Sequence, residues 1–139
     1  MPLKTFDHVN IRTANLDAMV DWYADILGLT TGFRPDFSFP GAWLYLGDQA
    51  IVHLVGTSTS PQVFGPDENL RMEHMAFRAS DFTSFKARLE ARGVPYRAVE
   101  IEDIDTIAVN IHDPDGNHIH VDFERSEATA NSGPGDNGG

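Results

Sequence analysis

The stretch Asp113-Pro-Asp-Gly-Asn-His-Ile-His-Val-Asp-Phe123 joins a turn to a short strand whose pattern recurs elsewhere in the chain. Asp-Pro-Asp-Gly is a composition typical of a turn. Because side chains on a strand point alternately to opposite faces, His118, His120 and Asp122 share one face, and the three apolar residues that alternate with them share the other. This alternation predicts a strand that packs one apolar face and leaves a polar face open.

The same order of strands and helices occurs twice along the chain. Residues 6–12 alternate in the same way, with His8, Asn10 and Arg12 on one face. From Leu16 the apolar residues follow a spacing of three and four, which is typical of one face of an amphipathic helix. The complete set of predicted elements is a strand at 6–12, a helix at 16–27, strands at 29–34, 42–46 and 50–55, a strand at 72–79, a helix at 81–92, and strands at 94–99, 104–111 and 117–124.

Each half therefore reads as strand, helix and three strands, which predicts an α+β fold built from tandem βαβββ units. We expect one domain over residues 3–124, with one repeat unit at about 3–56 and the other at about 70–124. Residues 125–139 are acidic and rich in Gly, Ser and Asn, so they bury too little apolar surface to offset their ordering entropy. We expect them to form a disordered tail.

Composition narrows the range of functions. The net charge of −11 argues against nucleic acid or an anionic membrane as partner, since both are bound by clustered Lys and Arg. No apolar run approaches the roughly 18 residues that span a bilayer, and the first residues lack the apolar core of a signal peptide. We expect a soluble, cytoplasmic protein. Because the chain has no cysteine, a metal must be held by histidine and carboxylate.

Four of the six histidines occupy matched positions in the two halves. His8 aligns with His74, and His53 aligns with His120. Each histidine alone is more typical of an ordinary strand or core residue, but duplicated units place equivalent residues about a pseudo-twofold axis, so the matched set can converge on a metal. His112 and His118 have no counterpart and are interpreted as structural, although His118 shares a face with His120 and could substitute for it.

Other residues on the same strands suit a small-molecule substrate. Arg12 shares the face of His8 and could bind a substrate carboxylate, although a solvated charge is as ordinary an interpretation. Trp43 and Tyr45, with Phe37 and Phe39, could form an aromatic wall around a planar or apolar substrate. Core packing would explain these rings about as well.

Several motifs together resemble the vicinal oxygen chelate superfamily, which includes glyoxalase I, extradiol dioxygenases and bleomycin-binding proteins. They are the opening Asp7-His-Val-Asn-Ile-Arg12, the helix end Trp22-Tyr-Ala-Asp-Ile-Leu-Gly-Leu29, and Asp113-Pro-Asp-Gly-Asn117. The resemblance covers about residues 3 to 124 and implies that the tandem units form a cupped mixed sheet. It also implies a divalent first-row metal, iron, nickel or zinc, at His8, His53, His74 and His120, and a homodimer.

The chain departs from the superfamily pattern at the last strand. Metal-binding members usually carry Glu where this chain has His120, so the carboxylate that serves as base in glyoxalase I has no counterpart at His53 or His120. Asp122, two positions further on the same face, offers a carboxylate only through a shifted register. The catalytic base is therefore not identified by the sequence.

Two classes of function follow from these observations. The first is a metal-dependent glyoxalase-like lyase or isomerase, or a dioxygenase-like enzyme, that chelates vicinal oxygens of a small substrate at a histidine-rich centre. The second is a metal-free binding or resistance protein that sequesters a planar ligand in the same cup, with Trp43 and Tyr45 in contact with it. An acidic surface would suit a cationic ligand.

Overall fold

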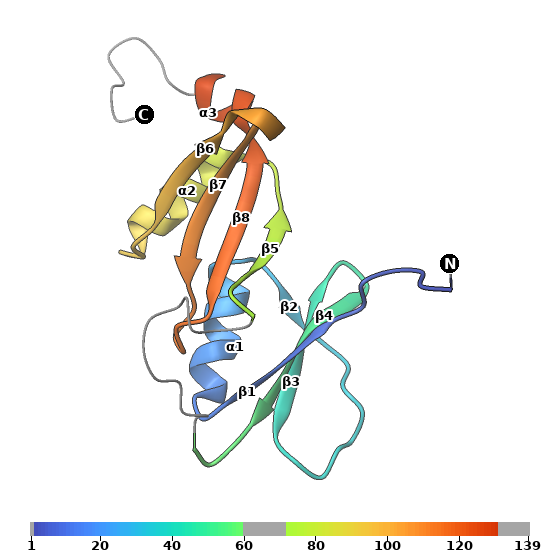
Figure 1. Ribbon diagram of the computed structural model, residues 1–139. Coiled ribbons are helices and arrows are strands. Elements are labelled where there is room, and N and C mark those ends of the chain that lie inside the picture. Colours follow the sequence, from blue (N-terminus) through green and yellow to red (C-terminus); the bar gives the residue numbers. More distant parts are fainter. Residues whose placement is uncertain (1, 60–71, 131–139) are drawn as a thin grey trace. The chain divides into compact units, whose positions relative to one another are not determined.

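The structure is a computed structural model that describes residues 2–59 and 72–130 (Figure 1). The chain divides into two compact units. One is formed by the N-terminal half together with Asp113–Asp115, and the other by the rest of the C-terminal half. Within the described ranges, no helix has the length and apolar character needed to cross a membrane.

The first unit is a four-stranded mixed sheet with one helix. Its strand order is β1-β4-β3-β2, in which β1 runs parallel to β4 and the other pairs are antiparallel. Its elements are β1 (Val9–Thr13), α1 (Leu16–Asp25), β2 (Thr30–Thr31), β3 (Gly41–Leu46) and β4 (Gln49–Gly56).

The second unit repeats this arrangement, with strand order β5-β8-β7-β6 and β5 parallel to β8. The α+β fold of tandem βαβββ units is therefore confirmed. Its elements are β5 (Met75–Arg78), α2 (Phe82–Ala91), β6 (Arg97–Ile101), the 3-10 helix η2 (Glu102–Ile104), β7 (Thr106–His112), β8 (His118–Glu124) and α3 (Arg125–Ala130).

Strand β8 separates polar and apolar residues as the alternation predicts. Ile119, Val121 and Phe123 are buried, whereas His118 and the other even-numbered residues are partly or fully exposed. Ring contacts from Phe82 and Phe85 of α2 reach Phe123, and Leu89 of the same helix is also buried. The helix thus covers the apolar face of β8 and leaves the histidine face free for other contacts.

Residues Arg125–Ala130, which the sequence assigns to the predicted tail, form the helix α3. Two contacts hold this helix in place. The Glu127 carboxylate accepts hydrogen bonds from the backbone N–H groups of Asp81 and Phe82 at the start of α2, at 2.7 and 3.0 Å. Arg125 forms ion pairs with Glu102 and Asp105 at 3.5 and 3.4 Å. The prediction for residues 131–139 lies outside the described residues.

Candidate metal centre

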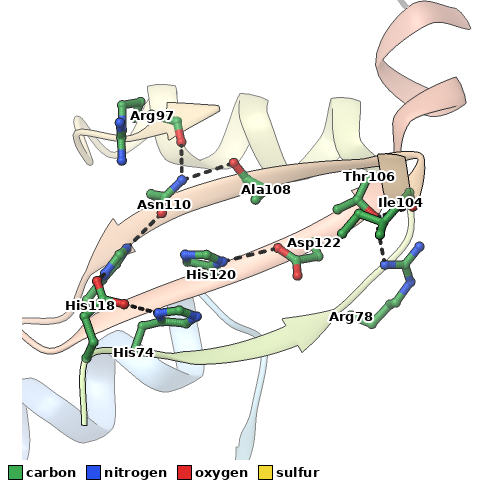
Figure 2. A network of polar contacts seen from close by, with 11 residues as sticks. His74, Arg78, Arg97, Ile104, Thr106, Ala108, Asn110, His118, His120 and Asp122 are labelled. Atoms are coloured by element: carbon green, nitrogen blue, oxygen red, sulfur yellow. Dashed lines mark hydrogen bonds and ion pairs between the residues drawn. The ribbon is translucent and has the colours of Figure 1, made fainter. Parts of the chain in front are cut away.

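Three histidines meet on the polar face of the second sheet (Figure 2). His118 and His120 project from β8, and His74 lies one residue before β5. One ligand nitrogen from each lies within 4.8 Å of the others. Metal–nitrogen bonds of about 2.1 Å place neighbouring nitrogens roughly 3.0–3.4 Å apart, so the three nitrogens would have to move closer together to bind one ion. Imidazole nitrogen suits first-row divalent metals, and these three residues fit such an ion.

The carboxylate of Glu73 lies between two of these rings. Its Oε1 is 2.9 Å from Nδ1 of His118, and its Oε2 contacts Nδ1 of His74. The hydrogen bond with His74, and then that with His118, lower the pKa of Glu73 below its ordinary value. The histidine cluster therefore has an anionic oxygen beside it, supplied by the residue that precedes His74.

Asn110 of β7 fixes the orientation of His118. Its Oδ1 lies 2.8 Å from Nε2 of His118, while its Nδ2 donates to the carbonyl oxygens of Arg97 and Ala108 at 3.1 and 3.3 Å (Figure 2). The two carbonyl oxygens can only accept hydrogen bonds, so the NH2 end of the Asn110 amide faces them. The amide oxygen therefore faces His118. Nε2 of His118 is therefore the protonated nitrogen, and Nδ1 is the atom directed at Glu73.

His120 stacks on His74, with ring centroids 4.0 Å apart and an interplanar angle of 6°. Burial, followed by the charge of His74, lowers the pKa of His120, which favours the neutral imidazole that binds metal. The nearest carboxylate on the same strand is Asp122, whose Oδ1 lies 3.8 Å from Nδ1 of His120. That oxygen is buried and has no hydrogen-bond partner among residues 2–59 and 72–130.

The first unit carries the matching pair of histidines. His8 and His53 stack with centroids 3.8 Å apart and an interplanar angle of 9°. Asp7 contacts Nδ1 of His8 at 2.6 Å, as Glu73 contacts His74. Burial, followed by the charge of His8, lowers the pKa of His53.

Trp43 stacks on His53 at 4.0 Å, so two aromatic planes contact the same imidazole. Two rings cannot stack on the same face of His53, so Trp43 lies on one face and His8 on the other. The three rings form a column. An open pocket of about 560 Å³ lies against this column in the first unit. Its lining residues are Asp7, His8, Trp43, Tyr45, Asp48, Gln49, Ala50 and His53.

The structure places the predicted site residues in two groups. His74 and His120 are together in the second unit, and His8 and His53 are together in the first. Arg12 is exposed on β1.

The structure adds His118, which the sequence left as structural, to the second group. His118 shares a strand face with His120, which favours a ligand. It has no counterpart in the first half, which favours a structural histidine, and the prediction rested on this second observation.

Comparison with known proteins agrees with the fold. The model of the Glyoxalase/Bleomycin resistance protein/Dioxygenase superfamily matches residues 5–121. The chain belongs to this superfamily. The curated relative Glyoxylase I 4 of Arabidopsis thaliana is 26% identical over 127 residues, which cover 86% of this chain and 70% of the relative.

Two solved structures show how the superfamily fold recurs. Lactoylglutathione lyase from Agrobacterium tumefaciens has a TM-score of 0.65 and 21% identity, covering 91% of this chain and 98% of that chain. A glyoxylase/bleomycin resistance protein/dioxygenase domain from Frankia sp. EAN1pec has a TM-score of 0.72 and 18% identity, covering 88% and 99%. At these identities the likeness shows the fold. Superfamily enzymes act on small molecules and use divalent metals, and the histidine triad could hold such an ion.

Proposed function

We propose that this superfamily member is a metal-dependent enzyme of the glyoxalase-like lyase or isomerase kind, or of the dioxygenase-like kind. The observation that carries the proposal is the convergence of His74, His118 and His120 within 4.8 Å on the polar face of one sheet. A bound iron, nickel or zinc ion would act as a Lewis acid toward vicinal oxygens of a small substrate. His74 and His120 are the ligands common to this cluster and to the matched set of the sequence.

The part of His8 and His53 in the site stays a prediction of the sequence. In the first unit His8 contacts the Asp7 carboxylate, and His53 lies 3.1 Å from the carbonyl oxygen of Ala50. Such second partners are typical of ligating histidines, because they fix which ring nitrogen carries the proton. Trp43 and Tyr45 would contact the substrate from the pocket wall, and Arg12 would bind an anionic group.

Metal content tests the proposal directly. Protein purified without added metal or chelator should contain about one equivalent of a first-row metal by mass spectrometry, and His74→Ala and His120→Ala should lose it. Glu124→Gln is the control, because this exposed carboxylate of β8 lies outside the triad. His8→Ala shows whether the first unit contributes a ligand. Unchanged metal content in both His74→Ala and His120→Ala would refute the proposal.

A metal-free binding protein is the second candidate, and the column of Trp43, His53 and His8 beside a 560 Å³ pocket favours it. A planar cation could stack on Trp43 while Asp7 and Asp48 balance its charge. Binding of a planar cationic dye in excess chelator, lost in Trp43→Ala, would support this function. Binding that disappears with chelator would contradict it.

Homodimer formation is proposed on the family resemblance alone. Sedimentation equilibrium of the full chain should give twice the mass of one chain. A monomer at all concentrations would contradict it.

A further inference from the structure

The triad of His74, His118 and His120 offers imidazole nitrogens and no carboxylate oxygen. The described residues place a carboxylate beside it. Glu73 precedes β5, and its two oxygens contact His118 and His74.

The hydrogen-bond network around His118 determines what can lie between it and Glu73. Asn110 holds its amide oxygen toward Nε2 of His118, because its Nδ2 donates to two backbone carbonyls. Nε2 must then carry a hydrogen, and a neutral His118 directs the lone pair of Nδ1 at Oε1 of Glu73, 2.9 Å away. Two electron-pair donors at this distance require a cation between them. That cation is either a proton or a metal ion.

The distance suits a metal ion as well as a proton. Metal–ligand bonds of about 2.1 Å meeting at right angles place two neighbouring donor atoms about 3.0 Å apart. The 2.9 Å between Glu73 and His118 agrees with that spacing. The ring of His74 stacks on that of His120, and its centroid lies 5.4 Å from that of His118, so Glu73 contacts two members of a cluster of three rings.

We propose that Glu73 is the anionic ligand of a three-histidine, one-carboxylate metal site made within the second unit by Glu73, His74, His118 and His120. The proposal rests on the metal-dependent function above and names its ligands. Asn110 is a positioning residue in this site, because it directs Nδ1 of His118 toward the ion.

Affinity for Co²⁺, measured by competition with a chromophoric chelator, tests the ligand set without any substrate. Glu73→Gln keeps the size of the side chain and removes its charge, and Glu73 is 46% exposed, so the variant should fold. Loss of a residue that only orients a ligand weakens metal binding by about 10–100-fold. We expect Glu73→Gln and His118→Gln each to weaken Co²⁺ affinity by more than 100-fold and to change the absorption spectrum of bound Co²⁺. Glu124→Gln, an exposed carboxylate on β8, should match the wild type.

The outcomes separate this inference from the proposed function. A loss smaller than 100-fold in either Glu73→Gln or His118→Gln, with circular dichroism unchanged, overturns the ligand set. If Co²⁺ binding requires His8, His74 and His120 but neither Glu73 nor His118, only this inference fails. If the wild type binds no metal at all, both fail together.

Discussion

The buried hydrogen bond between Tyr23 and Asp113 should contribute strongly to stability. Tyr23 of α1 is fully buried, and its hydroxyl donates to Oδ2 of Asp113 at 2.8 Å. Asp113 is only 5% exposed, and its other oxygen accepts from the backbone N–H of Asp115 at 3.0 Å. Burial, followed by the charge of Asp113, raises the pKa of Tyr23. The phenol therefore stays protonated and donates to the carboxylate throughout the physiological range.

Tyr23→Phe removes one oxygen atom and leaves the ring in place. Hydrogen bonds to charged groups contribute about 1.5–3 kcal/mol, and a buried carboxylate oxygen that loses its donor also keeps its desolvation cost. We therefore expect Tyr23→Phe to lower the free energy of unfolding by about 2 kcal/mol. Tyr96→Phe is the matched control, because its hydroxyl bonds to the exposed Glu90, and such surface changes usually lie within about 0.5 kcal/mol.

Urea unfolding followed by circular dichroism measures both variants, with the slope m compared to establish that the unfolding transition is the same. The double-mutant cycle with Asp113→Asn isolates the coupling between the two side chains. A loss below about 0.5 kcal/mol in Tyr23→Phe, or a coupling near zero, would refute the reasoning. Since Asp113 begins the turn that leads into β8, the cycle also measures how firmly that turn is anchored.

Two further predictions concern other polar contacts of the second unit. Asn110→Ala removes the group that orients His118 and should weaken metal affinity by about 10–100-fold in chelator competition, while Asn110→Asp, which keeps an acceptor at His118, should lose less. Burial, followed by the Glu90 hydrogen bond, raises the pKa of Tyr96 to about 12. The folded protein should therefore show a tyrosinate absorbance step near pH 12, and Tyr96→Phe should lack this step. Because the folded state keeps a proton that the unfolded state loses above about pH 10, stability should fall as pH rises from 10 to 12 and fall less in Tyr96→Phe.

The sequence predicted the repeated elements because each depends on local periodicity. In β8 the alternation of polar and apolar residues alone distinguishes the histidine face from the face that packs on α2. Helix α3 could not be predicted in this way. Its composition is poor in apolar residues, and its position depends on Glu127, which reaches backbone donors 45 and 46 residues earlier in the chain.

The sequence could propose metal ligands only among residues that have an equivalent in the other half of the chain. His74 and His120 have counterparts in the first half, so they enter the predicted set. His118 and Glu73 depend on a different kind of information, because the orientation of His118 is set by Asn110, which faces it from the neighbouring strand. Asp7 and Glu73 also align in the sequence. Only the structure shows that each of these carboxylates contacts a histidine ring.

The two halves differ at two pairs of equivalent positions, Trp43 and Asn110, and Ile51 and His118. Trp43 lies opposite His53 in the β3–β4 ladder, and Asn110 lies opposite His120 in the β7–β8 ladder. The indole stacks on His53, whereas the Asn110 amide bonds to His118 and holds it toward Glu73. The same backbone ladder thus carries a column of stacked rings in one unit and a cluster of histidines in the other. If this reasoning holds, Trp43→Asn should abolish dye stacking without adding a second equivalent of bound Co²⁺, because the first unit has no residue equivalent to His118: the aligned position on β4 is Ile51.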